Sequence, residues 1–141
     1  MPYLDTSVLG SYYCPEALSQ SVNRVLASVA DAVISPLVEV EFYSLLALKV
    51  RTREMTRAGA QAVVARFRAH RGDQLYRMVE IGAAEYGRAS DWLGQFAIPL
   101  RALDALHLAA AIANGQTLIT TDKALAAAAG QLRVSCQLIK G

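Results

Sequence analysis

Four acidic positions, spread over the whole chain, are the residues best suited to do chemistry. They are Asp5, one member of the pair Glu39 and Glu41, Asp104, and Asp122. If the fold brings them together, their charges repel by roughly 1 to 4 kcal/mol per pair, depending on the effective dielectric constant. A bound cation relieves that repulsion, and carboxylate ligands favour Mg²⁺ or Mn²⁺ over Zn²⁺. With His70 and His107 as the only histidines, a zinc site of nitrogen and sulfur ligands is not expected.

A divalent ion held by carboxylates supports one reaction in particular. Such an ion lowers the pKa of bound water and polarises a phosphate, so in-line attack on a phosphodiester is the natural chemistry. No nucleophilic side chain is needed for that reaction. The question is therefore whether the elements around the four acids bring them to one place.

Apolar runs predict strands that alternate with helices. Strands are expected over residues 3–4, 32–34, 75–81, 117–120 and 134–139. A helix is expected after the first strand, and further helices over 36–50, 53–70, 83–96, 101–113 and 124–129. Strands separated by helices indicate a parallel sheet with helices on both faces, because parallel neighbours need crossover connections. The predicted fold class is therefore α/β, and such sheets bind ligands at the carboxyl ends of their strands.

The acids are expected at that carboxyl edge. Asp5 closes the first strand and Asp122 follows the fourth, while Asp104 opens the helix that leads into the fourth strand. Neighbouring strands are ~4.8 Å apart, so the carboxylates should lie within one or two strand spacings. Glu39 and Glu41 both belong to the helix after the second strand, roughly 200° apart around its axis, and periodicity does not choose between them.

Each acid also has a purely structural interpretation. Asp5 is suited to cap a turn with its neighbours, and the helix dipole favours Asp104 in a first helical turn whatever its function. Asp104 is the harder one to explain in this way, because its helix is apolar on nearly every side and a buried carboxylate needs a partner. His107, three residues further on, is a candidate partner, although a hydrogen-bonded core histidine is the more common role.

Four ordered motifs carry a resemblance to a known family. They are Leu4-Asp5-Thr6-Ser7-Val8-Leu9, Ile34-Ser35 with a glutamate six residues past the serine, Leu103-Asp104-Ala105-Leu106-His107-Leu108-Ala109, and Leu118-Ile119-Thr120-Thr121-Asp122. Together they resemble the PIN domain, and more narrowly a VapC-type toxin ribonuclease of a type II toxin–antitoxin system. The resemblance covers residues 1 to about 139, and it implies a three-layer α/β/α sandwich with a central parallel sheet of four to five strands.

The resemblance also implies a site. Its acidic quartet, which binds Mg²⁺ or Mn²⁺ in the family, matches Asp5, Glu41, Asp104 and Asp122, so that the serine spacing selects Glu41 over Glu39. Thr120 matches a hydroxyl that the family places beside the metal, and Thr6 and Ser7 are expected to hold nearby water or backbone. Leu125 departs from the pattern, because many relatives carry an aromatic residue there.

What the resemblance implies for function is an endoribonuclease that acts on RNA. It further implies a homodimer and a separately encoded antitoxin protein as partner. A phosphoaspartate receiver or a haloacid-dehalogenase-like phosphatase fits worse, because the acids and lysine that those classes require are missing. The alternative that stays open is a PIN-like binding module that has lost its metal and its catalysis.

The charge balance agrees with a polyanionic substrate. The 14 Lys and Arg residues outnumber the 12 Asp and Glu residues by two, and by six once the four site acids are set aside. Half of the basic residues form one block between 49 and 71: Lys49, Arg51, Arg53, Arg57, Arg66, Arg68 and Arg71. This block is suited to grip phosphates or is simply a solvated helix face. Arg101, three residues before Asp104, is the better candidate for a phosphate contact beside a metal.

Length and composition frame these expectations. A chain of 141 residues suits a single domain over 1–141, and 54% apolar with 18% charged residues excludes intrinsic disorder. No apolar run reaches bilayer length and no signal peptide is visible, so a cytoplasmic protein that does not enter the membrane is expected. Cys14 and Cys136 are expected to be reduced thiols.

Overall fold

The computed structural model describes residues 1–141 and contains one parallel sheet of five strands. The strands are β1 (Tyr3–Leu4), β2 (Ala32–Ile34), β3 (Tyr76–Met78), β4 (Leu118–Thr120) and β5 (Cys136–Leu138). Their order across the sheet is β3-β2-β1-β4-β5, and every neighbouring pair is parallel. The α/β class and the parallel sheet predicted from the sequence are confirmed.

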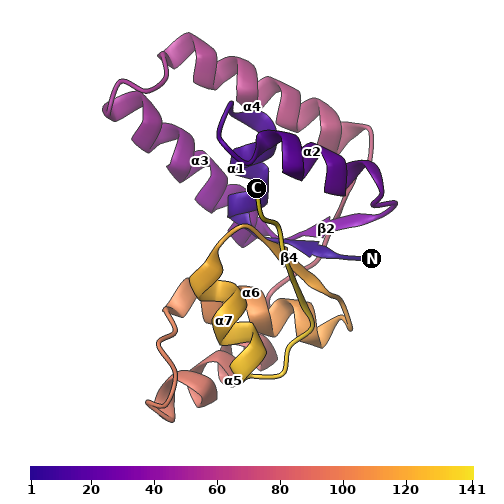
Figure 1. Cartoon of the computed structure of the whole chain (residues 1–141), viewed down its shortest axis with the longest axis vertical. Helices are drawn as coiled ribbons and strands as arrows, with labels where there is room; N and C mark the ends of the chain where they lie inside the picture. Colours follow the sequence, from indigo (N-terminus) through magenta and orange to yellow (C-terminus); the bar gives the residue numbers. More distant parts are fainter.

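Seven helices cover the two faces of this sheet (Figure 1). On one side lie α1 (Thr6–Tyr13), α2 (Ser19–Ala27), α3 (Pro36–Arg51) and α4 (Arg57–Gly72). On the other side lie α5 (Ala83–Gly94), α6 (Ala102–Ala113) and α7 (Lys123–Gln131). The result is the expected three-layer α/β/α sandwich. None of the helices combines the length and the apolar character that crossing a lipid bilayer requires.

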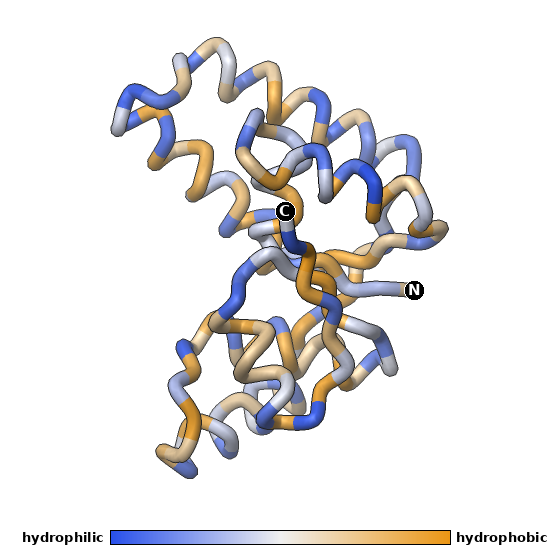
Figure 2. The backbone as a smooth tube through the Cα atoms, viewed as in Figure 1, coloured by the Kyte–Doolittle hydropathy of each residue, from blue (hydrophilic) through white to orange (hydrophobic).

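The core lies between the helices and both faces of the sheet. It is a cluster of 25 buried residues, and β1, β2 and β4 are buried along their whole length. Strands that are covered on both faces need continuous apolar runs rather than alternating ones, which is the pattern in the sequence. Figure 2 shows hydrophobic residues along the strands and polar residues at the turn between α3 and α4.

The helix that carries the site glutamate begins as the sequence predicts. Ser35 is its N-cap and accepts a hydrogen bond from the Val38 amide at 3.4 Å, and Pro36 occupies the first helical position. The end of β2 and the start of α3 are thereby fixed at the carboxyl edge of the sheet.

Several boundaries differ from the predicted ones. α4 was predicted to begin at residue 53 but begins at Arg57, because Arg53 adopts a left-handed conformation (φ 62°) and Thr56 caps the helix instead. The strands predicted over 75–81 and 134–139 are only three residues long. Two helices, α1 and α2, fill the segment for which a single helix was expected.

Candidate functional site

The site is built first around Asp5, which follows β1 directly. Leu4 is in register with Ile119, so Asp5 lies level with Thr120 at the end of β4. The Asp5 side chain accepts hydrogen bonds from Ser7 Oγ on Oδ1 (2.6 Å) and from Thr120 Oγ1 on Oδ2 (2.8 Å). The residue is only 4% exposed. Burial raises the pKa of Asp5, against the opposing effect of these two hydrogen bonds and of His107. A buried carboxylate of this kind favours a nearby cation.

Glu41, rather than Glu39, lies on the side of α3 that contacts α1 and α6. Its Oε1 accepts a hydrogen bond from Thr6 Oγ1 at 3.0 Å and another from Nε2 of His107. Burial would raise the pKa of Glu41, but the hydrogen bonds from His107 and from the Thr6 hydroxyl outweigh it, so the pKa is lowered. Glu39 lies on the other side of α3, where it pairs with Arg71. The geometry of the helix therefore makes the choice that periodicity left open.

His107 is a buried, hydrogen-bonded histidine, but not the partner of Asp104. That expectation is wrong: its ring joins Glu41 through Nε2 and the Tyr3 hydroxyl through Nδ1, at 2.8 Å for the latter. The two side chains differ in burial: that of His107 is 2% exposed, whereas that of Asp104 is 18% exposed and contacts Arg101. Sequence reasoning missed Tyr3 altogether. The available signal was a tyrosine inside a fully buried strand, whose hydroxyl needs a partner.

Asp104 and Asp122 are linked by Arg101 instead. Arg101 Nε lies 3.3 Å from Asp104 Oδ2, and Arg101 Nη2 lies 4.0 Å from Asp122 Oδ2. Asp122 uses its other oxygen, Oδ1, to cap α7 by accepting the amides of Ala124 and Leu125. The charge of Arg101 also contributes to lowering the pKa of Glu41. One guanidinium thus lies beside two of the four predicted acids and affects the charge balance at a third.

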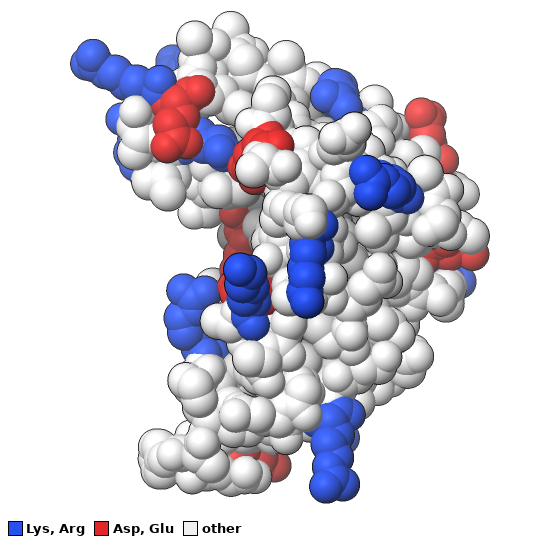
Figure 3. All heavy atoms as spheres, in the orientation of Figure 1, with Lys and Arg blue, Asp and Glu red and all other residues white.

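The four acids have different partners. Asp5 is bonded to two hydroxyls and Glu41 to one hydroxyl and His107, whereas Asp104 and Asp122 both lie beside Arg101. Figure 3 shows acidic side chains at the base of a hollow between the α3–α4 arm and the part formed by α5 to α7, with basic side chains beside it. A cavity of about 330 Å³ has Arg101, Asp104 and Leu125 among its lining residues.

The four carboxylates suit a divalent ion by their chemistry but not by their present spacing. As the side chains stand, no three His, Cys, Asp or Glu residues are close enough together to hold a metal ion. The chemistry of the donors nevertheless fits a hard cation: they are carboxylate oxygens, one is buried with its pKa raised, and a positive group already lies between two others.

The predicted hydroxyl residues contact the acids. Thr6 donates to Glu41 and Ser7 donates to Asp5, while Thr120 donates to Asp5 and accepts the amide of Asp122 at 2.9 Å. Ser7 Oγ also accepts the Thr121 amide at 3.0 Å, which joins α1 to the end of β4. These hydroxyls therefore orient the carboxylates, and contact with a substrate stays a prediction.

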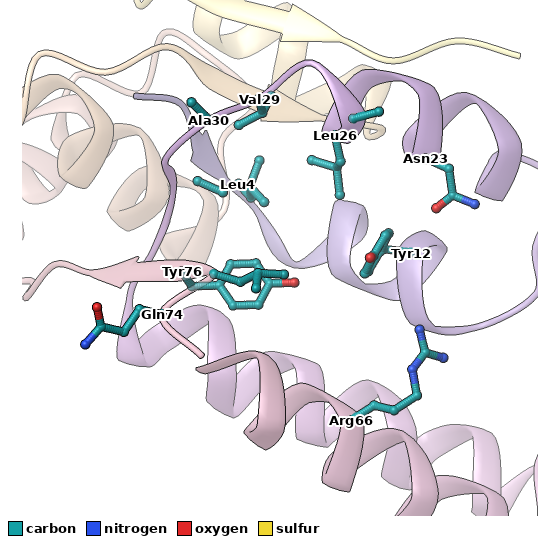
Figure 4. A pocket seen from close by; sticks show the side chains of 12 residues that line it. Leu4, Tyr12, Asn23, Leu26, Val29, Ala30, Arg66, Gln74 and Tyr76 are labelled. Atoms are coloured by element: carbon teal, nitrogen blue, oxygen red, sulfur yellow. The ribbon is translucent and has the colours of Figure 1, made fainter. Parts of the chain in front are cut away.

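A second cavity, of about 540 Å³, lies away from the acids (Figure 4). Its lining comes from α1, α2, α4 and the start of β3. Tyr12, Leu26, Arg66 and Tyr76 are among the lining residues. Ala32 and Tyr76 are the first residues of β2 and β3. The cavity therefore opens at the amino ends of these strands, the edge opposite the carboxylates.

The basic block between 49 and 71 is largely engaged within the chain. Lys49 pairs with Glu16 and Glu54, and Arg71 pairs with Glu39. Arg66 and Arg68 lie over the rings of Tyr13 and Tyr43 respectively. The three remaining arginines lie near the turn between α3 and α4: Arg51, Arg53 and Arg57.

Comparison with known proteins identifies the family. A sequence model described as PIN domain matches residues 3–131. The chain belongs to the PIN domain family. No curated protein matches this PIN domain significantly in sequence.

Solved structures share the fold of this PIN domain at low sequence identity. VapC20 of Mycobacterium tuberculosis, a toxin that cleaves the sarcin-ricin loop, is similar with a TM-score of 0.73 and 22% identity, over 91% of this chain and 95% of that one. FitAcB of Neisseria gonorrhoeae is similar with a TM-score of 0.69 and 22% identity, over 96% of each chain. VapBC2 of Rickettsia felis, bound to promoter DNA, is similar with a TM-score of 0.68 and 16% identity, over 99% of this chain and 100% of that one.

The buried charge of Asp5 generates a stability prediction. Asp5→Asn should raise the free energy of unfolding of the metal-free protein at pH 7 by up to about 1 kcal/mol, because removal of a desolvated charge outweighs the loss of one of the two hydroxyl hydrogen bonds, which the amide nitrogen cannot accept. The raised pKa of Asp5 means that the folded protein takes up a proton before the unfolded chain does. Wild type therefore gains stability as the pH falls through that pKa, and the advantage of the variant shrinks toward acid.

Thermal unfolding in EDTA at pH 7 and pH 5 measures this difference. Asp91→Asn, at an exposed position of α5, is the matched control and should change stability little at either pH. If the stability of Asp5→Asn relative to wild type does not decrease between pH 7 and pH 5, the raised pKa of Asp5 is wrong.

Proposed function

We propose that this PIN domain is a divalent-metal-dependent endoribonuclease whose acidic residues are Asp5, Glu41, Asp104 and Asp122. The observation that carries the proposal is that all four acids lie directly after a strand or in the first two turns of a helix: Asp5 after β1, Glu41 in α3, Asp104 in α6 and Asp122 between β4 and α7. Arg101 lies beside Asp104 and Asp122, and its charge also contributes to lowering the pKa of Glu41. Mg²⁺ or Mn²⁺ is the proposed cofactor, since all the donors are carboxylates.

Each residue has a proposed role in phosphodiester hydrolysis. Asp5, Glu41 and Asp104 would hold the ion directly or through water, and Asp122 would orient the attacking water or hold a second ion. The bound ion supplies a water of lowered pKa and a polarised phosphate. Ser7 and Thr120 keep the Asp5 oxygens in place, and Thr6 does the same for Glu41. Arg101 is exposed over 81% of its side chain, so it can reach the phosphate of a bound RNA.

The biological setting we propose is a toxin–antitoxin pair. Support comes from the similar structures, which are a VapC toxin, FitAcB, VapBC2 bound to promoter DNA, and a toxin–antitoxin complex from Klebsiella pneumoniae. The proposed partners are an RNA substrate and a cognate antitoxin protein. A homodimer is also proposed, and it would sediment at twice the 15.2 kDa of one chain.

Glu41 and Glu39 provide a matched test of the nuclease. Glu41→Gln should lower Mn²⁺-dependent cleavage of RNA by about 100-fold or more, because it removes a charge from the proposed metal site. Glu39→Gln removes the same charge from the same helix but on the face that pairs with Arg71, and should leave the rate within about twofold. Gel analysis of a labelled RNA with Mn²⁺ or EDTA measures both.

Asp104→Asn should lower Mn²⁺-dependent cleavage of RNA as strongly as Glu41→Gln does, because it also removes a charge from the proposed metal site. Equal activity in wild type and both site variants would assign the cleavage to a contaminant. No cleavage of any RNA by wild type with Mn²⁺, together with no uptake of Mn²⁺ in calorimetry, would favour the non-catalytic PIN-like binding module.

Arg101 should compete with the metal ion and assist the RNA. In Arg101→Gln, Mn²⁺ should bind about 3- to 10-fold more tightly, since a positive charge that faces the site is gone. The same variant should bind RNA about 3- to 10-fold more weakly, because one phosphate contact is lost. Calorimetry measures the first effect and fluorescence anisotropy with Ca²⁺ or without metal measures the second.

Lys123→Gln is the control for Arg101→Gln. Lys123 is adjacent to Asp122 in sequence, but it makes no ion pair with the site acids. If the two variants tighten Mn²⁺ binding equally, the effect reports net charge alone and the bridging role of Arg101 is wrong.

A further inference from the structure

A continuous chain of buried hydrogen bonds ends at Glu41. The Tyr3 hydroxyl lies 2.8 Å from Ser35 Oγ and 2.8 Å from His107 Nδ1, and His107 Nε2 bonds Glu41 Oε1. Tyr3 and Ser35 are fully buried and His107 is 2% exposed. Tyr3 lies in β1, Ser35 is the N-cap of α3, and His107 lies in α6. The hydrogen-bond chain therefore runs from the centre of the sheet to the site.

Only one direction of donation satisfies every group in this chain. Glu41 Oε1 is an acceptor, so His107 Nε2 carries the hydrogen and Nδ1 accepts from the Tyr3 hydroxyl. The Tyr3 oxygen then accepts from the Ser35 hydroxyl, and Ser35 Oγ accepts from the Val38 amide. In the reverse direction, two acceptors would face each other at Glu41 or the buried Ser35 hydroxyl hydrogen would have no acceptor.

The consequence for Glu41 is a fixed carboxylate with one oxygen in use. Both of its protein donors, Thr6 Oγ1 and His107 Nε2, bond to the same atom, Oε1. Oε2 receives no hydrogen bond from the protein and is left for another ligand. The Glu41 side chain is 22% exposed, so this oxygen can be reached from the hollow.

We infer that Tyr3 and His107 are positioning residues, which hold Glu41 so that its second carboxylate oxygen is directed to a divalent ion. The inference rests on the proposed function, because it assigns the ion to the same site. Groups that orient a metal-binding carboxylate typically change metal affinity by 10- to 100-fold when they are lost. Neither Tyr3 nor His107 touches the substrate or the ion.

The protein contains a natural comparison for this arrangement. The Tyr13 hydroxyl lies 2.6 Å from His70 Nδ1 and 2.7 Å from the Tyr76 hydroxyl, so it too is a buried tyrosine bonded to a histidine. No hydrogen bond leads from this pair to Glu41 or to the other site acids. Loss of the Tyr13 hydroxyl should therefore cost stability without affecting a metal site.

Two substitutions of His107 separate positioning from packing. In His107→Gln the amide nitrogen lies where Nε2 was and can still donate to Glu41, whereas in His107→Asn the amide reaches only toward Tyr3. Isothermal titration of the whole protein with Mn²⁺ should give a dissociation constant within about threefold of wild type for His107→Gln and 10- to 100-fold weaker for His107→Asn. Equal losses in both variants, or none in either, would overturn the inference.

Two substitutions of tyrosine and one spectrum complete the test. Tyr3→Phe should weaken Mn²⁺ binding about 3- to 10-fold, while Tyr13→Phe should leave it unchanged; equal effects would count against a positioning role. In the metal-free protein, ¹⁵N NMR of the His107 ring should show a protonated Nε2 and an unprotonated Nδ1. A ring protonated on Nδ1 and not on Nε2 would contradict the proposed direction of hydrogen-bond donation and with it the inference.

The same data distinguish failure of this inference from failure of the proposed function. If wild type binds Mn²⁺ but the dissociation constants of the variants do not differ as predicted, the metal site is supported and the positioning role is wrong. If wild type binds no Mn²⁺ at all, the proposed metal site falls and the positioning role with it, even where the NMR spectrum shows the expected tautomer.

Discussion

The desolvated charge of Asp5 is the interaction on which the rest of the site depends. A carboxylate that is 4% exposed loses most of its hydration, and two hydroxyl donors replace only part of it. The raised pKa of Asp5 records that deficit. The position is set by the register of β1 against β4, so the fold cannot form without bringing this charge inside. A cation bound beside Asp5 would offset this deficit, which is why the proposed function places one there.

The remaining acids differ in how firmly they are held. Glu41 is tied at one oxygen to two donors that are themselves buried or half-buried, which fixes its direction. Asp122 is fixed at Oδ1 by the two amides that it caps in α7. The side chain of Asp104 contacts only the exposed side chain of Arg101, and exposed ion pairs of this kind contribute little stability. Asp104 is therefore the acid whose side chain can move most easily without disturbing the core.

Much of this arrangement could be predicted from the sequence, because a parallel sheet has a simple rule. Residues that follow apolar runs lie at the carboxyl edge, and that alone brought Asp5 and Asp122 together. The rule fails inside helices, where the choice between Glu39 and Glu41 depends on how α3 is rotated against the sheet. Periodicity does not specify that rotation for a helix whose two faces both carry apolar residues, and the resemblance to the PIN family was needed to select Glu41.

The partner of His107 shows a second limit of sequence reasoning. Spacing along α6 places Asp104 and His107 on one face, yet the ring of His107 bonds Tyr3 and Glu41, which are 104 and 66 residues away in sequence. Such contacts are decided by which buried donors and acceptors meet when the layers pack. A buried tyrosine hydroxyl, a capping serine and a histidine each need a partner, and here satisfying all three produces a single path that terminates on a site carboxylate. The polar groups of the core are therefore part of the proposed site, whereas the similar Tyr13–His70 pair, which leads to no acid, only stabilises the fold.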